Sequence, residues 1–329
     1  MYFTGFADEA GAEIDVQIRV TRELGWSNIE CRQAGSENLH DISDADFDIV
    51  YGKLADAGVS VNSFGSTIAN WGCQVTDPFE DTLTRVDRAI PRMQRLRSKL
   101  VRMMSYAVRK LEDGGDAPDQ MEEERFRRLR EIVTRFTDAG ITPVHENCMN
   151  YGGMSYQHTL KMLENVPGLK LVFDTGNPIF TADRSKPEPQ PRQNTWEFYT
   201  NVREHIAYLH IKDGEFDGEN MNHCWAGDGS GCVRQVVTDL LRNGYDGGIS
   251  MEPHMGTVFH DPSVTSEATK RQSTYIEYGR RFMTLWMRSE PRSRNARARF
   301  SSTPFWCQAR HNPGITSLNH VNLDVAPCF

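Results

Sequence analysis

The sequence lacks several features that would place it in a common functional class. Its seven cysteines are scattered and form no Cys-x-x-Cys pair, which indicates reduced thiols rather than a disulfide framework. Neither Gly-x-x-x-x-Gly-Lys nor Gly-x-Gly-x-x-Gly occurs, so no nucleotide cofactor is expected. The apolar runs are barely strand length, far below the roughly 20 residues of a membrane span. The start of the chain has no signal-like character, and we expect a cytoplasmic protein.

Basic residues are too few to favour binding to polyanions. Lysine and arginine together number 37 against 45 aspartates and glutamates, which gives a formal net charge of -8 and a pI near 5.7. Nucleic acids and anionic membranes attract basic surfaces, so neither is expected as a partner. A neutral or polar small molecule fits this charge better.

The C-terminal segment, residues 287–329, differs from the rest of the chain in charge. From Arg288 onward six arginines face only Glu290 and Asp324, a local net charge of +4 that leaves -12 for residues 1–287. Scattered Pro, Ser and Asn without sustained periodicity predict a disordered or loosely docked extension. A nucleic-acid arm is the less favoured interpretation, because one short basic run is common in solvated tails.

Strand-like and helix-length segments alternate along the rest of the chain. Strands are expected near residues 2–6, 28–32, 59–65, 99–105, 141–146, 169–174, 206–211 and 247–252. Helices are expected at residues 14–24, 44–57, 79–96, 120–139, 156–163, 196–205, 233–241 and 267–285. Several helices end in a glycine just before the next strand, namely Gly25, Gly58, Gly140 and Gly244. This alternation predicts an α/β fold, a single (β/α)8 TIM barrel over residues 1–286 with an irregular C-terminal extension.

Four neighbouring strands of this barrel end in a side chain that can bind a metal. Glu146, Asp174, His210 and Glu252 close the fifth to eighth expected strands. In a TIM barrel these ends converge on the active site. Oxygen and imidazole donors without a thiolate suit one divalent ion, Mn²⁺, Mg²⁺, Co²⁺ or Zn²⁺. Each residue alone has an ordinary structural explanation, but four coincident placements favour a catalytic metal.

The segments around these donors resemble a known family. His145-Glu146-Asn147, Phe173-Asp174-Thr175-Gly176-Asn177, His210-Ile211-Lys212-Asp213 and Met251-Glu252-Pro253-His254 are similar to motifs of the xylose isomerase-like TIM barrels, the sugar isomerase/epimerase superfamily. The resemblance covers about residues 1–285. It implies a divalent metal held by Glu146, Asp174, His210 and Glu252, with the two glutamates also able to act as the acid/base pair. Homo-oligomers formed through barrel helices are a further family-level expectation.

The superfamily defines the chemistry better than the substrate. Its members include ketose 3-epimerases, hydroxypyruvate isomerase, inosose dehydratase, dehydroshikimate dehydratase, C-glycoside-cleaving enzymes and endonuclease IV. Its ketose epimerases carry a His three positions after the metal Asp and an Arg six positions after the metal His, where this chain has Asn177 and Phe216. A standard ketose-epimerase assignment is weakened accordingly, although Asn177 can still bond a substrate hydroxyl. Endonuclease IV is a poorer match, because its three-metal cluster needs more histidines.

Other residues near the expected rim are candidates for contacts with a sugar. Lys212 and His254 each lie two residues beyond a metal ligand, on the same face of an extended chain. Trp71 and Tyr151 stand in the loops after the third and fifth strands, where aromatic rings can stack on a sugar. Surface pairing of Lys212 and loop packing of the two aromatic residues are the structural alternatives.

Two charged or titratable residues within strands have open interpretations. Strand alternation points His145 away from the metal, but a loop at the strand end can turn it inward as a further acid/base. Arg102 is either an anchor for substrate or an ion-paired barrel residue, with Glu30 and Arg32 as its partner network. The glycine-rich run at residues 226–231 either binds an anion or is simply flexible.

The sequence thus predicts a metal-dependent isomerase or epimerase of a small sugar, keto-sugar or polyol. A metal that chelates a carbonyl and an adjacent hydroxyl makes the neighbouring C–H acidic, and Glu146 and Glu252 could remove and return the proton through an enediolate. A metal-dependent lyase or dehydratase, inosose dehydratase-like or C-glycoside-cleaving, is the alternative. A barrel that has lost its metal and only binds sugar is a third interpretation, opposed by the four retained donors.

Overall fold

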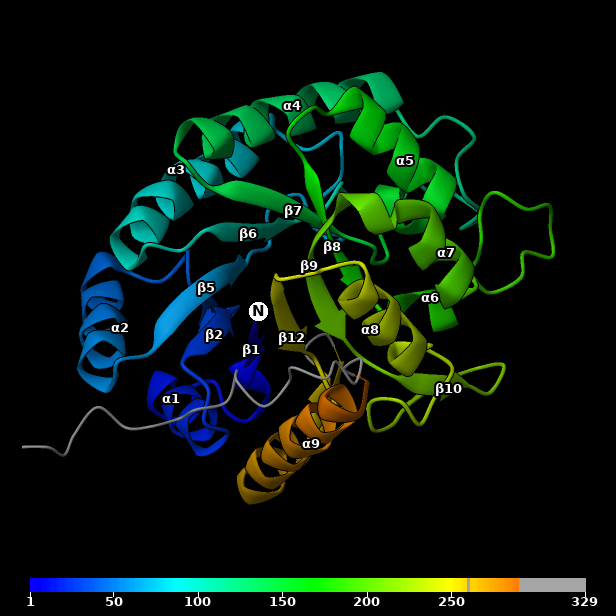
Figure 1. Ribbon diagram of the computed structural model, residues 1–329. Coiled ribbons are helices and arrows are strands. Elements are labelled where there is room, and N and C mark those ends of the chain that lie inside the picture. The colour runs from blue at the N-terminus through cyan, green and yellow to red at the C-terminus, as the bar shows by residue number, and fades with distance from the viewer. Residues whose placement is uncertain (259–260, 290–329) are drawn as a thin grey trace, which may run out of the picture. The chain divides into compact units, whose positions relative to one another are not determined.

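A barrel of parallel strands forms the centre of the protein (Figure 1). The computed structural model describes residues 1–258 and 261–289. The barrel strands are β1 (Tyr2–Gly5), β2 (Asn28–Cys31), β5 (Ser60–Gly65), β6 (Leu100–Met103), β7 (Thr142–Glu146), β8 (Lys170–Asp174), β9 (Ile206–Ile211) and β12 (Gly248–Met251). They form one eight-stranded sheet in the order β1-β12-β9-β8-β7-β6-β5-β2. A parallel bridge between Phe6 and Glu30 joins the two ends, which confirms the expected (β/α)8 barrel.

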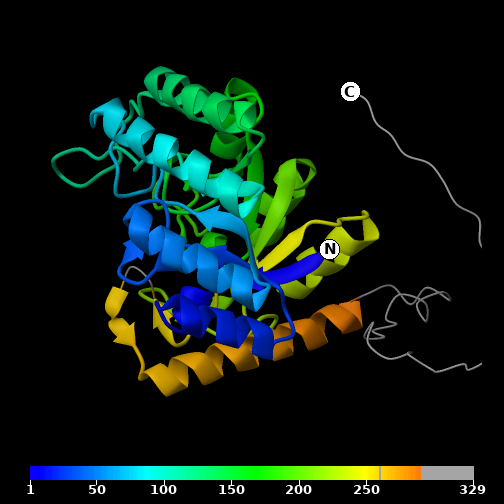
Figure 2. The ribbon, with the colours of Figure 1, turned by 90° about the vertical axis from the view of Figure 1, so that its left-hand side faces the viewer.

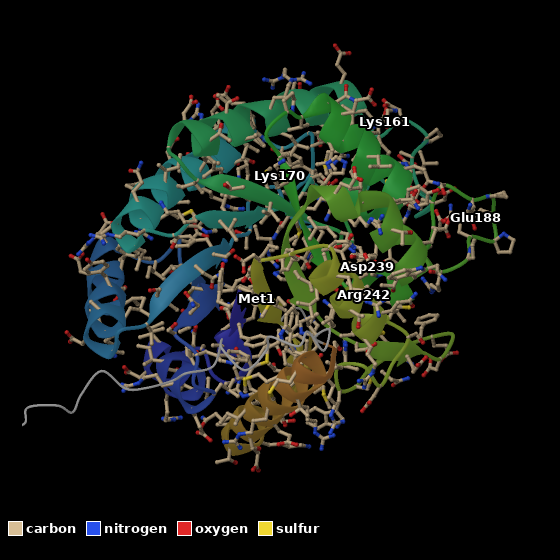
Figure 3. The ribbon with its side chains drawn as sticks, in the orientation of Figure 1. Met1, Lys161, Lys170, Glu188, Asp239 and Arg242 are labelled. Carbon is tan, nitrogen blue, oxygen red and sulfur yellow. The ribbon has the colours of Figure 1, made fainter. Side chains whose placement is uncertain are left out.

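Helices surround the strands on the outside (Figures 1 and 2). They are α1 (Ile14–Glu23), α2 (Asp44–Ala57), α3 (Phe79–Leu96), α4 (Glu122–Asp138), α5 (Tyr156–Asn165), α7 (Thr195–Val202), α8 (Val233–Arg242) and α9 (Ala268–Ser289). Figure 3 places Lys161 on α5 and Asp239 and Arg242 on α8, in this outer ring, with Met1 and Lys170 at strand starts near the centre. All the helices expected from the sequence are present.

Short elements between these units were missed by the sequence analysis. They are the 3-10 turns η1 (Ala7–Glu9), η2 (Tyr151–Met154) and η3 (Arg203–His205), the helix α6 (Asn177–Phe180), and the pairs β3 (Gln33–Ala34) with β4 (Glu37–Asn38), β10 (Gly214–Phe216) with β11 (Met221–His223), and β13 (Thr257–Val258) with β14 (Asp261–Thr265). Such segments are too short for periodicity to be visible in the sequence. Several of them supply loops at the C-terminal rim of the barrel.

The helix ends follow the local sequence. Ser43 caps α2 by accepting a hydrogen bond from the Asp46 amide at 3.1 Å, and Asn194 caps α7 in the same way through the Glu197 amide at 2.9 Å. The four glycines expected as C-caps all have positive φ, between 65° and 78°. A side chain at these positions would force a left-handed conformation on an L-residue. The caps therefore set where each helix stops and the chain turns into the next strand.

The barrel interior changes from apolar to charged along the strands. Val144, Val172 and Tyr208 form a small buried cluster of their own inside the barrel. Because successive side chains of a strand point to opposite faces, the residue two positions further along also faces the interior. These residues are Glu146, Asp174 and His210. The strand pattern therefore places a buried, mainly apolar layer beneath a layer of candidate metal donors.

Helix α9 continues past residue 286, the expected end of the barrel. The chain divides into a unit Met1–Pro291 and a unit Arg292–Phe329. Helix α9 runs to Ser289, so residues 287–289 of the expected tail are helical. The remainder of that tail, residues 290–329, lies outside the described residues. Within the described part no helix is long and apolar enough to cross a membrane, and the cysteines described there are free thiols.

Candidate metal centre

The four expected ligands meet at the C-terminal ends of their strands. Glu146, Asp174, His210 and Glu252 are all buried, and each offers one ligand atom within 4.8 Å of those of the others. The register explains this proximity, because Asp174 pairs with His210 across β8 and β9, and Glu252 follows directly on β12, the other neighbour of β9. The convergence predicted from the strand ends is therefore present in the fold.

Neighbouring groups orient the His210 ring. Its Nε2 lies 2.9 Å from Glu30 Oε2, and both side chains are fully buried. Its Nδ1 faces Glu146 Oε1 at 3.8 Å and makes no ordinary hydrogen bond to the described residues. A carboxylate behind a ligand histidine fixes the ring and raises its basicity. Glu30 therefore holds His210 with Nδ1 directed at the donor cluster.

Asp174 is held by the start of the short helix α6. Its Oδ1 accepts hydrogen bonds from the amides of Gly176 at 2.8 Å and Asn177 at 2.7 Å. Its Oδ2 accepts no ordinary hydrogen bond from the described residues, although Lys212 Nζ lies 3.3 Å away. One oxygen thus anchors the side chain while the other is directed at the cluster.

Three buried cations compensate the carboxylates. Arg102 Nη1 lies 2.9 Å from Glu146 Oε2, Arg32 Nη1 lies 2.9 Å from Glu252 Oε1, and Lys212 Nζ lies 2.9 Å from Glu252 Oε2. Removing one partner of such a buried pair typically costs about 3–5 kcal/mol. The pairs therefore keep both glutamates ionised inside the barrel.

The aromatic floor of the site lies between the two arginines. The guanidinium carbons of Arg32 and Arg102 stand 4.4 Å and 5.2 Å from the centre of the Phe6 ring. The same ring meets His210 edge-on, with ring centres 5.1 Å apart. The face of an aromatic ring attracts cations, so Phe6 fixes both guanidinium groups beneath the cluster.

Burial and charge push the pKa values of the cluster in different directions. Burial alone would raise the pKa of Glu146, but Arg102 and His210 outweigh it and lower that pKa to about 2. Burial opposes a charge on His210, but Glu30 and then Glu146 outweigh it and raise the pKa of the ring to about 10. Burial raises the pKa of Asp174 to about 6 against the opposing charge of Lys212. Without a metal, His210 is therefore an imidazolium at neutral pH.

The donor set fits one divalent cation. Three carboxylates and one imidazole supply oxygen and nitrogen ligands of the kind that Mn²⁺, Mg²⁺, Co²⁺ and Zn²⁺ accept. The buried His210 Nδ1 and Asp174 Oδ2 are both directed into the cluster without an ordinary hydrogen bond. The neighbouring cation is Lys212, whose side chain lines the adjacent cavity.

Glu252 also belongs to a second group, with Glu9 and His254. Here a cation is already in place, because Arg32 lies 2.9 Å from Glu252 Oε1 and 3.9 Å from Glu9 Oε1. Arg32 also binds both oxygens of Asp8, at 2.9 Å and 3.2 Å. We interpret this group as an ion-pair network that supports Glu252.

A cavity of about 300 Å³ lies above the donors. Most of the residues expected from the sequence to contact substrate line it, namely Trp71, Arg102, Asn177, Lys212 and His254, together with Glu146 and Glu252. Asn177 Nδ2 donates to Glu146 Oε1 at 3.0 Å, and His254 Nε2 lies 3.7 Å from Glu252 Oε1. The residues expected from the sequence to contact substrate therefore form part of the lining of this cavity.

Two expected site residues lie elsewhere. His145 is fully buried on the other side of β7, where its Nε2 contacts Ser105 Oγ at 3.0 Å and Asn150 Oδ1 at 2.9 Å. Strand alternation keeps it on the outer face of the strand, so the structure does not bring it to the metal cluster. Tyr151 is also buried away from the cavity, with its hydroxyl donating to Glu122 at 2.5 Å. Tyr151 therefore packs within its loop, which was the structural alternative to contact with a sugar.

The glycine-rich run at residues 226–231 already has an anion, the carboxylate of Asp213. Its oxygens accept hydrogen bonds from the amides of Gly227, Gly229 and Gly231 at 2.8 to 3.1 Å, and from Gly214 at 2.9 Å. These amides are satisfied from within the protein. The loop is therefore fixed to the end of β9 rather than open to a phosphate.

The network expected around Arg102 is arranged differently. Glu30 binds His210, and Arg32 binds Asp8 and Glu252, so neither pairs with Arg102. The signal in the sequence was the alternate spacing of Glu30, in β2, and Arg32, directly after it, which places both side chains on the inward face. Asp8 and Glu9 were missed because they lie in a short 3-10 turn after β1.

Comparisons with known proteins agree with this fold. The family model of the xylose isomerase-like TIM barrel matches residues 18–276. A protein of that description from Mycobacterium smegmatis, in complex with magnesium, is 18% identical with a TM-score of 0.60, over 87% of this chain and 97% of that one. D-allulose 3-epimerase from Methylomonas sp., in complex with D-allulose, is 15% identical with a TM-score of 0.61, over 86% and 96%.

A third similar structure is a probable 3-DHS dehydratase from Bacillus anthracis, 14% identical with a TM-score of 0.59, over 84% of this chain and 98% of that one. No curated protein sequence gives a match. Identities this low show a shared fold alone, but the family model matches most of the chain. The chain belongs to the xylose isomerase-like TIM barrel family.

Proposed function

We propose that this protein is a divalent-metal-dependent isomerase or epimerase of a small sugar, keto-sugar or polyol. The observation that carries the proposal is the convergence of Glu146, Asp174, His210 and Glu252, of which the two glutamates line a cavity. Its volume of about 300 Å³ is at the small end of ligand pockets, in keeping with a single sugar. Membership of a family whose solved relatives include sugar epimerases supports this substrate class.

The two glutamates have the geometry of a proton-transfer pair. A bound metal would supply Lewis-acid polarisation of a substrate carbonyl. Glu146 ends β7 and Glu252 follows β12, and the two strands are separated in the sheet by β8 and β9. Their carboxylates therefore approach the cavity from different sides. Arg102 and Arg32 each bind one oxygen of a glutamate, so each carboxylate is held ionised, the state in which it can accept a proton from carbon.

A lyase or dehydratase is the second candidate, favoured by the position of Lys212. Its ammonium lies 2.9 Å from Glu252 Oε2 and lines the cavity. Burial opposes its charge, but Asp174 and Glu252 outweigh it and raise the pKa of Lys212. A protonated amine beside a carboxylate base can donate a proton to a departing oxygen. The same site would then eliminate water or an alcohol instead of returning the proton to carbon.

The test is solvent exchange in deuterated water. Protein loaded with Mn²⁺ is incubated with a panel of keto-sugars and polyols, and products are read by NMR and mass spectrometry. Deuterium uptake at carbon without loss of mass supports isomerase or epimerase, whereas loss of water or of an alcohol supports the lyase. Glu146→Gln and Glu252→Gln should abolish turnover while the exposed Glu37→Gln keeps it. Sugar binding without any metal-dependent reaction would contradict both and leave a sugar-binding barrel.

A further inference from the structure

A second cavity adjoins the one above the metal centre. It has a volume of about 490 Å³ and shares three side chains with the first, Trp71, Met149 and Phe180. Its other lining residues come from the loops that follow β5, β6 and β8. Shared walls make the two cavities neighbouring compartments at the C-terminal rim. A group attached to a ligand at the metal centre would therefore reach the second cavity past these three side chains.

The shared wall is apolar and partly exposed. Trp71 is 37% exposed and Met149 is 40% exposed, and both are among the few large apolar side chains that the described residues leave in solvent. Phe180 beside them is half-buried. An indole, a thioether and a phenyl ring grouped at a cavity mouth favour contact with a flat apolar surface. Core packing does not account for their exposure.

The outer edge of the second cavity is cationic. Lys110, Arg184 and Arg192 line it, and its lining includes no Asp or Glu. Lys110 and Arg184 both pair with the same carboxylate, Asp116, which leaves the edge with net positive charge. Arg192 stacks over the ring of Phe216 with its guanidinium carbon 4.1 Å from the ring centre. Cationic hydrogen-bond donors at this edge can bind oxygen substituents of a ligand.

The walls of this cavity are held in place by buried hydrogen bonds. Gln193 Nε2 donates to the carbonyls of Gly153 at 2.8 Å and Met154 at 3.1 Å, and the Arg184 amide donates to Met154 at 2.9 Å. These contacts tie the loop between α6 and α7 to the loop after β7. Figure 3 shows Glu188 at the outer edge of the former loop. The second cavity is thus preformed in the folded chain, as ligand sites usually are.

We propose that the substrate carries a planar aromatic group with oxygen substituents, joined to the sugar that the metal centre binds, and that the second cavity receives this group. The inference rests on the proposed function and extends it from a simple sugar to an aryl-substituted keto-sugar, which keeps the carbonyl that the proposed proton transfer requires; the glycosides below serve as unreactive binding probes. A second sugar ring fits less well, because six of the eleven lining residues are apolar and the polar ones include the cations of the edge. Trp71, Met149 and Phe180 would contact the ring, and Arg192 its oxygen substituents.

The test compares three matched ligands by calorimetry on the metal-loaded protein: methyl glucoside, 4-hydroxyphenyl glucoside and a glucose disaccharide of the same anomeric configuration, with a galactoside series in parallel. We expect the aryl glycoside to bind about tenfold more tightly than its methyl counterpart in at least one series. Phe180→Ala, at the end of α6, and Trp71→Ala, in the loop after β5, should each remove most of this advantage. Ile49→Ala, at an exposed apolar residue of α2, should keep it.

Three outcomes would overturn the inference. They are equal binding of aryl and methyl glycosides, binding of neither, and a greater gain from the disaccharide, which would assign the cavity to a second sugar. The proposed function is judged separately by metal-dependent exchange on simple sugars. Exchange without an aryl advantage overturns the second site alone, whereas an aryl advantage without exchange overturns the proposed reaction alone.

Discussion

Binding of a divalent metal should release about one proton from this protein at pH 8. In the metal-free site His210 is an imidazolium, because Glu30 at 2.9 Å and Glu146 at 3.8 Å outweigh the effect of burial and raise its pKa to about 10. A metal can bind Nδ1 only after that nitrogen has lost its proton. Metal binding and protonation therefore compete for the same atom.

The size of the effect follows from the pKa. At pH 8 the ring is about two pH units below its pKa, so nearly every molecule carries the proton that the metal must displace. Affinity should then rise about tenfold, or about 1.4 kcal/mol, for each pH unit between 7 and 9. Asp174, with its pKa raised to about 6, is ionised at pH 8 and should add a second proton only in more acidic solution.

Calorimetric titration with Mn²⁺ in two buffers of different ionisation enthalpy counts the protons released. Wild type should release about one at pH 8. Glu30→Gln removes the largest charge that raises the His210 pKa, so its release should fall to less than half a proton. Glu37→Gln, an exposed change of the same kind, should release as many protons as wild type. A wild type that releases none, or a Glu30→Gln variant that matches wild type, would refute this reasoning.

Three further outcomes are expected. Mn²⁺ at a free concentration 100 times its Kd should raise the free energy of unfolding by about 2.7 kcal/mol. The effect is measured as a rise in Tm that EDTA reverses, and an unchanged Tm would contradict metal binding at this site. Asp213→Asn alters a side chain that accepts hydrogen bonds from four backbone amides, so the free energy of unfolding in urea should fall by about 2–3 kcal/mol. Hydrogen exchange should accelerate at the amides of Gly227 and Gly229. Unchanged exchange at these amides would contradict the role of Asp213 in holding the loop. Burial lowers the pKa of His145 to about 4, so the folded ring stays neutral while the unfolded ring takes up a proton below about 6.5. The part of the free energy of unfolding that depends on the neutral ring, about 3 kcal/mol, is present above pH 6.5 and is lost as pH falls toward 4. In His145→Gln, the free energy of unfolding should therefore fall less steeply over this pH range. The same pH dependence in wild type and variant would refute this expectation.

The sequence predicted the barrel and the metal donors for the same reason. Strands separated by helices of similar length leave few alternatives to parallel β/α units, and parallel strands bring their C-terminal ends to one rim. Glu146, Asp174, His210 and Glu252 are strand-end residues, so their convergence follows from topology without knowledge of side-chain packing. For these four residues, position along the strand was sufficient to predict that they converge.

The supporting residues depend on three-dimensional packing that a sequence pattern does not contain. Glu30 and Arg32 were recognised as inward-facing charges, but β2 lies beside both β1 and β5, and the pattern could not decide their partners. His145 and Tyr151 were placed near the ligand because of their neighbours in the chain. Strand alternation points His145 outward to Ser105, and loop packing turns Tyr151 toward Glu122. The second cavity depends on long loops, for which periodicity gives no information.

The most direct test of the metal centre is anomalous diffraction at the zinc edge from crystals soaked in Zn²⁺, beside crystals of His210→Ala. One strong peak is expected in wild type, about 2.0–2.2 Å from a carboxylate oxygen each of Glu146, Asp174 and Glu252 and from His210 Nδ1. The same peak should be lost or much weaker in the variant. A wild-type map with no peak at these four residues, or with its main peak at Glu9 and His254 instead, would contradict the account.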